Sequence, residues 1–160
     1  MTNREMNTLI KNELKETGYN IKDFSVSVKD CGYSTSIKVT IKSPYINRKD
    51  VETLLSKHQN IDRDDANGEI LEGGNNYLFV EYQYGIFETV AYKEWSATAM
   101  GLMKEAKEII RIFDGLYLIC TNGTMEIRQQ NEKCHATRCC DFGSLCEYIF
   151  KFAQFGTIAV

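Results

Sequence analysis

Residues 24–42 read FSVSVKDCGYSTSIKVTIK, and this stretch sets the fold class of the first half of the chain. Apolar and polar side chains alternate over 24–28 and again over 36–42, and the turn-forming segment 31–34 separates the two runs. Alternation with a period of two is typical of strands that bury one face. The stretch therefore predicts a β-hairpin.

Helical patterns lie on both sides of this hairpin. Residues 7–16 carry apolar side chains four positions apart, and Gly18 follows as a C-cap. After the hairpin, Asn47 is suited to cap a helix that runs through Lys57. A polar, acidic loop follows, and then the aromatic run 77–88 predicts a strand with a bend at Gly85.

The second half repeats this order of elements. Residues 97–113 mix apolar and charged side chains at helical spacing, and Asp114-Gly115 follows as an expected helix end. A hairpin is predicted over 116–120 and 124–128, because Asn122-Gly123 between them tolerates the positive φ angles of a tight turn. The last predicted helix places five side chains on one face: Phe142, Leu145, Cys146, Ile149 and Phe150.

We therefore expect an α+β protein with two helix–hairpin–helix lobes around an antiparallel sheet. The N-terminal lobe spans 1–90 and the C-terminal lobe spans 91–160. The two lobes share only the order of their elements, since no residue-level repeat aligns them.

Composition restricts the functional class. The 160 residues include 19 Lys plus Arg and 22 Asp plus Glu, for a net charge of −3, and the two signs alternate along the chain. Proteins that bind DNA through its phosphates need clustered basic residues, so direct DNA binding is not expected. Neither a membrane span nor a signal peptide is apparent, which predicts a cytosolic protein.

Four of the six cysteines lie between Cys134 and Cys146. In the reducing cytosol, such clustering favours metal binding over disulfides. We expect a loop here that presents a structural zinc site and stabilises the small C-terminal lobe. The leading ligands are Cys134, His135, Cys139 and Cys140.

The sequence leaves alternatives for these cysteines. Cys120 or Cys146 can supply the fourth ligand, although the position of Cys146 on an apolar helix face favours simple burial. A redox pair of Cys139 and Cys140 is a further alternative.

Sequence motifs for catalysis are absent. The chain has neither the H-x-E with P-C-x-x-C pattern of deaminases nor H-E-x-x-H. His58 follows a charged stretch and is interpreted as a surface residue near a helix end. We therefore do not expect an enzyme.

The segment 62–72 is a candidate partner-binding surface. Five carboxylates against one arginine, Arg63, give it a local charge of −4, which suits a basic surface on another protein. Its register does not fit a calcium loop; a solvated turn is the alternative interpretation. The five predicted partner-binding residues are Asp62, Asp64, Asp65, Glu69 and Glu72.

A family resemblance covers roughly residues 8–82. It is carried by the strand segments 24–28 and 32–39, by Ile61-Asp62-Arg63-Asp64, and by the run 68–75, GEILEGGN. In these residues the chain resembles the domain associated with large polyvalent proteins of phages and conjugative elements. The resemblance implies a mobile-element protein that acts against host defences, and it brings no catalytic residues.

A short acidic protein with a cysteine-rich tail also resembles the phage and prophage anti-CRISPR proteins. That resemblance implies a protein that inhibits a type II CRISPR nuclease by binding it. The sequence leaves open whether the protein is a monomer or a homodimer. An RNA-guided nuclease holds nucleic acid in basic channels, where an acidic protein can block DNA. The alternatives are a small zinc-containing nucleic-acid or transcription module, suggested by Lys133 and Arg138, and a small hydrolase.

Overall fold

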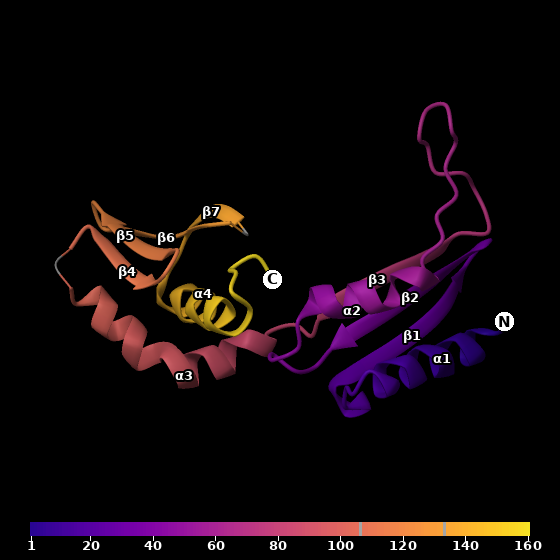
Figure 1. Cartoon of the computed structure of the whole chain (residues 1–160), viewed down its shortest axis with the longest axis horizontal. Coiled ribbons are helices and arrows are strands. Elements are labelled where there is room, and N and C mark those ends of the chain that lie inside the picture. The colour runs from indigo at the N-terminus through magenta and orange to yellow at the C-terminus, as the bar shows by residue number, and fades with distance from the viewer. Residues whose placement is uncertain (106, 133) are drawn as a thin grey trace. The chain divides into compact units, whose positions relative to one another are not determined.

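The computed structural model shows an α+β protein in two compact units, Met1–Tyr84 and Gly85–Val160 (Figure 1). The structure describes every residue except Ala106 and Lys133, and for Cys134 it describes the backbone alone. Within the described residues there are four α-helices, a three-stranded sheet and a four-stranded sheet. The division falls at Tyr84–Gly85, whereas the sequence placed it at 90.

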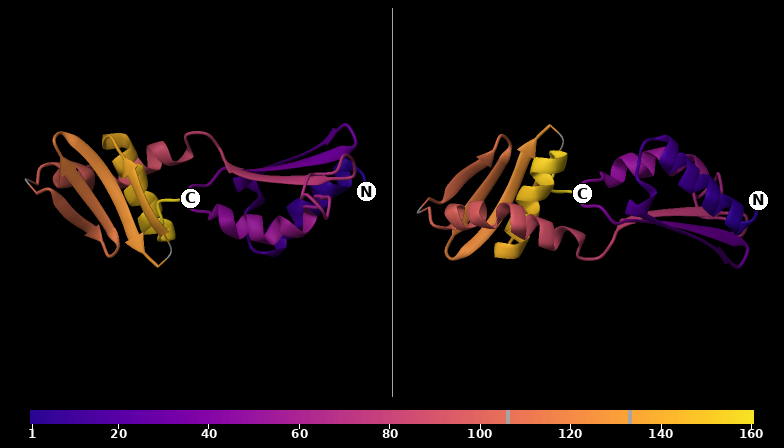
Figure 2. Two further views of the ribbon diagram at one scale, coloured as in Figure 1. Left: turned by 90° about the horizontal axis from the view of Figure 1, so that it is seen from above. Right: turned by 90° about the horizontal axis from the view of Figure 1, so that it is seen from below.

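The first unit is a mixed sheet with two helices on one face. Its elements are α1 (Asn3–Glu16), β1 (Phe24–Cys31), β2 (Ser34–Ile41), α2 (Arg48–Leu55) and β3 (Asn76–Tyr82). The strands lie in the order β1-β2-β3; β1 and β2 are antiparallel, and β2 and β3 are parallel. Figure 2 shows α1 and α2 on the same side of this sheet.

The predicted hairpin 24–42 is confirmed and contributes five of the ten buried core residues of the first unit. The register pairs Phe24 with Ile41 and Cys31 with Ser34. Because successive strand residues point to opposite faces, its alternating apolar side chains all face the helices. Each fully buried aliphatic side chain contributes about 1.5–3 kcal/mol relative to exposure. The core comprises Ile10, Leu14, Phe24, Val26, Ile37, Val39, Ile41, Val51, Leu55 and Val80.

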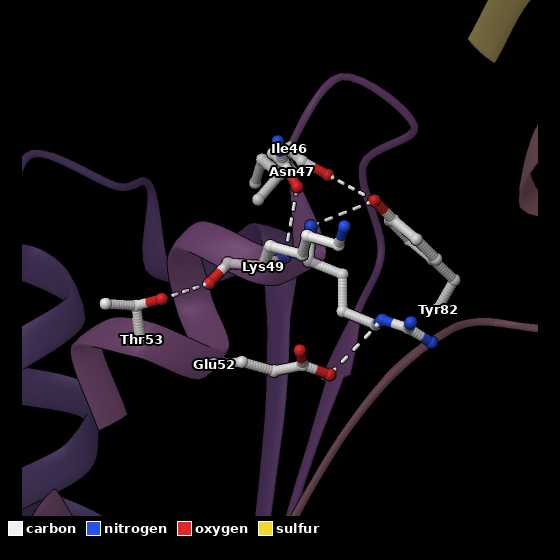
Figure 3. Close-up of polar contacts among 7 residues, drawn as sticks. Ile46, Asn47, Lys49, Glu52, Thr53 and Tyr82 are labelled. Carbon is white, nitrogen blue, oxygen red and sulfur yellow. Dashed lines mark hydrogen bonds and ion pairs between the residues drawn. The ribbon is translucent and has the colours of Figure 1, made fainter. Parts of the chain in front are cut away.

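The start of α2 is fixed to the end of β3 by Tyr82. The Tyr82 hydroxyl donates to the Ile46 carbonyl at 2.8 Å and accepts from the Arg48 amide at 3.0 Å (Figure 3). The predicted Asn47 cap is confirmed, since its side-chain oxygen accepts from the Lys49 amide. The Tyr82 hydroxyl and the Asn47 side chain thus bind two helix-start amides that have no partner inside the helix.

The second unit is an antiparallel meander with two helices on one face (Figure 2). Its helices are α3 (Ile86–Met103) and α4 (Phe142–Phe155). Its strands are β4 (Ile109–Phe113), β5 (Leu116–Thr121), β6 (Thr124–Asn131) and β7 (Cys134–Cys139), paired in chain order.

Two local predictions in this unit are confirmed. Asn122 and Gly123 form the β5–β6 turn with φ angles of 51° and 79°. The last helix buries Leu145, Cys146, Ile149 and Phe150, as its pattern indicated. Cys146 is therefore a core residue.

Several predictions for 77–139 are wrong. The strand from residue 77 ends at Tyr82, and Gly85 with a φ of 71° begins α3 instead of bending a strand. Residues 109–113 form β4, which pairs with β5, and Asp114-Gly115 is a hairpin turn rather than a helix end. The cysteine segment is strand β7 rather than a loop. The second unit is therefore no helix–hairpin–helix, and the strands do not form one antiparallel sheet.

Gln129 fixes the residues after α4 to the second sheet. It is 1% exposed; its side-chain oxygen accepts from the Ile158 amide at 2.8 Å and from the Thr157 hydroxyl at 3.2 Å. Its side-chain nitrogen donates to Asn131 at 3.0 Å. Both the oxygen and the nitrogen of the Gln129 side chain are thus hydrogen-bonded, so its burial does not cost much free energy of folding.

Glu13 joins α1 to the 3₁₀ turn, Ser56–His58, that follows α2. Its two carboxylate oxygens lie 2.8 Å from His58 Nε2 and 3.0 Å from Lys57 Nζ. The side chains of Glu13 and His58 are only 16% and 11% exposed, so His58 is not the free surface residue that the sequence suggested. Burial alone would raise the pKa of Glu13, but hydrogen bonds from His58 and Lys57 lower it below the usual 4.5.

We expect the substitution Glu13→Gln to destabilise the first unit by about 1.5 kcal/mol at pH 7. A carboxyl whose pKa is lower in the folded state stabilises the fold above its unfolded pKa and loses that effect as pH falls. The difference between wild type and Glu13→Gln should therefore shrink as the pH falls below 4.5 towards 3. Denaturant unfolding at pH 7, 5 and 3 measures it. Glu16→Gln, on the exposed side of α1, is the control, and a difference that does not depend on pH would contradict the assignment.

Candidate functional site

The five predicted partner-binding carboxylates lie in one loop of the first unit. This acidic loop, residues 59–75, joins the 3₁₀ turn Ser56–His58 to β3 and extends away from the sheet (Figure 1). Asn60 and Asn76 bridge its two ends through paired backbone hydrogen bonds of 3.0 and 2.7 Å. A second bridge joins Arg63 to Ile70. The acidic loop is thus a narrow, self-paired excursion from the sheet.

Hydrogen bonds within the acidic loop shape its tip. The Asp64 carboxylate accepts from the amides of Ala66 at 2.7 Å and Asn67 at 3.2 Å. The Asp64 amide donates to the Glu69 carbonyl at 2.8 Å, and the Gly68 amide donates to the Asp64 carbonyl at 2.9 Å. Asp and Asn side chains that bond to the following amides are typical of tight turns. Asp64 therefore organises the tip.

The base of the acidic loop is held by Asn75, which is not among the predicted site residues. Asn75 is 2% exposed; its side-chain oxygen accepts from the Asp62 amide and its nitrogen donates to the Leu71 carbonyl, both at 2.7 Å. Its own carbonyl accepts from the Thr35 amide at 2.8 Å. The sequence does contain a signal for this residue, because Asn75 is the last residue of the GEILEGGN run that carries the family resemblance. Only the fold shows that this asparagine is buried.

The predicted carboxylates divide into two groups. Asp62, Asp65, Glu69 and Glu72 are exposed, whereas Asp64 is half-buried and bonded inside the loop. With Arg63 as the only basic residue, the acidic loop carries a charge of −4. A fixed group of like charges raises the local concentration of an oppositely charged surface and speeds its arrival. Four carboxylates are therefore free to face a partner.

The predicted zinc ligands lie along β7 and just after it. The register pairs Gln129 with Ala136 and Ile127 with Arg138, so Ala136 and Arg138 are on the helix-facing side of the sheet. His135 and Cys139 are on the other side and exposed. They are four residues apart, which is about 13 Å along a strand. The structure does not bring them together.

The remaining ligand positions give a similar result. The side chain of Cys134 lies outside the described residues, as does Lys133. Among the side chains that the structure describes, no group of three or more His, Cys, Asp or Glu is placed to hold a metal ion. Cys140 donates its amide to the Met125 carbonyl at 3.0 Å, and burial, then Asp141, Cys120 and Cys139, raise the pKa of its thiol to about 11. A metal bound there would have to displace the thiol proton.

No protein-family model, curated protein or solved structure matches this chain. The helices within the described residues are too short or too polar to span a bilayer.

We expect Asn75→Ala to loosen the acidic loop. The substitution leaves the Asp62 amide and the Leu71 carbonyl without their partner, which costs about 1–3 kcal/mol. Denaturant unfolding should show this loss, and hydrogen exchange should show faster exchange of the Asp62 amide. Asn67→Ala is the control, because exposed Asn67 accepts a single bond from the Glu69 amide. Equal effects of the two variants would contradict the role given to Asn75.

Proposed function

We propose that this chain is a mobile-element inhibitor that binds a host type II CRISPR RNA-guided nuclease stoichiometrically and blocks the loading or cleavage of target DNA. The supporting observation is the acidic loop, a hydrogen-bonded projection with four exposed carboxylates. Such a nuclease holds its guide and target in a positively charged channel. Binding alone is enough for inhibition, so the proposal requires no catalytic residue.

The hydrogen bonds of the acidic loop favour a binding role over that of a solvated turn. Ordering a flexible loop on binding costs free energy that subtracts from affinity. Here Asn75 and Asp64 hold the loop in place before any partner arrives. The exposed carboxylates are then available for steering and for pairing with Lys or Arg at the edge of an interface.

The charge distribution favours local contact over imitation of a long DNA segment. The whole chain carries only −3, while the acidic loop alone carries −4. A mimic of duplex DNA needs negative charge spread over many positions, since DNA carries about one charge per 1.7 Å of its axis. The proposed mode is therefore the insertion of one acidic projection into a basic groove of a protein.

A structural zinc in the second unit is a separate part of the proposal. The support is the sequence cluster of Cys134, His135, Cys139 and Cys140. Because β7 is an edge strand, it can leave β6 without disturbing the rest of the sheet. Zinc binding by all four residues requires that departure, since His135 and Cys139 are about 13 Å apart along the strand. The metal would then replace the β6–β7 hydrogen bonds as the constraint on this segment.

We expect the wild-type protein to protect target DNA from a type II nuclease at about one inhibitor per nuclease. The variant Asp62→Asn, Asp65→Asn, Glu69→Gln, Glu72→Gln should bind about tenfold or more weakly at low salt, because it lacks the steering charges. Its control is Glu16→Gln, Glu105→Gln, Glu108→Gln, Glu132→Gln, which removes four exposed carboxylates elsewhere and gives the same net charge. Cleavage protection and surface plasmon resonance measure both.

Absence of wild-type binding to such nucleases would refute this partner. Equal weakening by the two variants would show that only the net charge matters and would remove the acidic loop from the site. Binding of DNA itself at physiological salt would favour the alternative of a nucleic-acid module.

We expect about one zinc per chain in protein purified reduced and without added zinc. Cys134→Ser with Cys139→Ser should lose the metal and lower Tm, because metal binding supplies folding free energy. Cys31→Ser, an exposed thiol of the first unit, is the control and should keep the metal. Elemental analysis and thiol titration measure the result. Metal-free protein with six freely titrating thiols would contradict the zinc site.

A further inference from the structure

A groove of about 380 Å³ runs beside the base of the acidic loop in the first unit. One wall is the β1–β2 turn, residues 31–34; the other is formed by residues 70–73 of the acidic loop with Asn75, and Tyr77 also lines it. Three apolar side chains here are strongly exposed: Tyr33 at 90%, Ile70 at 45% and Leu71 at 41%. Contiguous apolar surface on a soluble protein is typical of an interaction site.

The apolar surface continues from the groove onto the open face of the sheet. Tyr77 lines the groove and also stacks on Phe79, with 6.5 Å between ring centroids and 23° between planes. Phe79 is 53% exposed, and both helices of the unit lie on the opposite face of the sheet (Figure 2). The groove and the aromatic pair therefore form one strip. Aromatic side chains of this kind contribute strongly to protein interfaces.

Hydrogen bonds fix the two walls of the groove to each other. The Gly74 amide donates to the Tyr33 carbonyl at 2.8 Å, and the Thr35 amide donates to the Asn75 carbonyl at 2.8 Å. Gly73 has a φ of 89°, and a Cβ there would lie 3.5 Å from the Tyr33 Cβ, so the walls pass close together at this point. The groove therefore exists before binding, which reduces the cost of complex formation.

The charges at the groove select a cationic partner. Among the described residues that line it, none is basic, and Glu72 is acidic. The Leu71 amide donates to the Asp62 carbonyl at 3.0 Å, so Asp62 lies next to the groove wall that Leu71 forms. An anionic membrane or nucleic acid would be repelled by this edge. A basic protein segment with an apolar anchor satisfies both the apolar walls and the acidic edge.

We infer that the groove seats an apolar side chain of a basic, extended segment of the partner protein, while the acidic loop pairs with the Lys or Arg residues beside it. The inference rests on the proposed function for the identity of the partner. The two features then have different kinetic effects. The carboxylates govern the association rate and its salt dependence, and the groove governs the dissociation rate.

The test uses the full chain with one groove variant that carries two substitutions, Tyr33→Ser and Leu71→Ser. Both side chains are exposed, so the fold should be kept, and circular dichroism verifies it. Ile109→Ser with Met100→Ser is the matched control, because these are exposed apolar residues of the second unit. We expect the groove variant to dissociate from the guide-loaded nuclease at least about 30-fold faster at both 50 and 500 mM salt, as for hot-spot residues. The control should change less than threefold.

The outcomes separate this inference from the proposed function. Tight binding by wild type with no effect of the groove variant would overturn the groove and leave the inhibitor proposal standing. If wild type binds no nuclease, a titration with the peptide Arg-Lys-Trp-Lys-Arg tests the groove directly. The peptide Arg-Lys-Gly-Lys-Arg is the control. The amide NMR signals of Tyr33 and Leu71 report binding. Shifts with the Trp peptide alone would support the groove as a site for basic, apolar segments. No shifts, or self-association through the groove in sedimentation, would overturn it.

Discussion

The parallel pairing of β3 with β2 determines where the candidate binding surface lies. Parallel neighbours cannot be joined by a tight turn, so the chain must return along the whole sheet before β3 begins. Here α2 and the 3₁₀ turn after it lie on that return, and the acidic loop begins and ends beside the start of β3, where Asn60 pairs with Asn76. Because Asn76 pairs with Thr35, the loop ends beside the β1–β2 turn. The groove between Tyr33 and Leu71 is a direct result of this register.

Three polar side chains satisfy backbone groups that the helices and strands leave unpaired. Asn75 bonds to both sides of the acidic loop, Tyr82 bonds to the chain before α2, and Gln129 bonds to the residues after α4. Each one lies in or next to a strand and reaches an irregular segment. Since a buried polar group without a partner costs free energy, these bonds keep the connections in one arrangement. For the acidic loop, that arrangement is the one that presents its carboxylates.

The second unit shows how strand geometry changes the meaning of a cysteine cluster. Closely spaced Cys and His residues in a loop can surround one ion, but in β7 His135 and Cys139 lie on one face of the sheet, about 13 Å apart along the strand. Cys146 lies in the α4 core, and Cys140 is half-buried with a raised thiol pKa. The hydrogen bonds of an edge strand and the bonds of a zinc ion are therefore competing constraints on the same residues. The metal content of the purified protein distinguishes the two constraints.

Local patterns in the sequence determined the elements whose signals are contained within a few residues. These are the 24–42 hairpin, the Asn47 cap, the Asn122-Gly123 turn and the apolar face of the last helix. These elements are caused by side-chain alternation, capping and backbone φ preference, which all act between residues close together in the sequence. The acidic residues of 62–72 were apparent for the same reason.

Tertiary structure alone decided the elements whose identity depends on distant partners. Residues 109–113 and 134–139 became strands because β5 and β6 offered them hydrogen-bonding edges, and residues 86–103 became a helix that packs against α4. The burial of Asn75 and the groove beside Tyr33 depend on contacts between segments some forty residues apart, which register sets and local pattern does not.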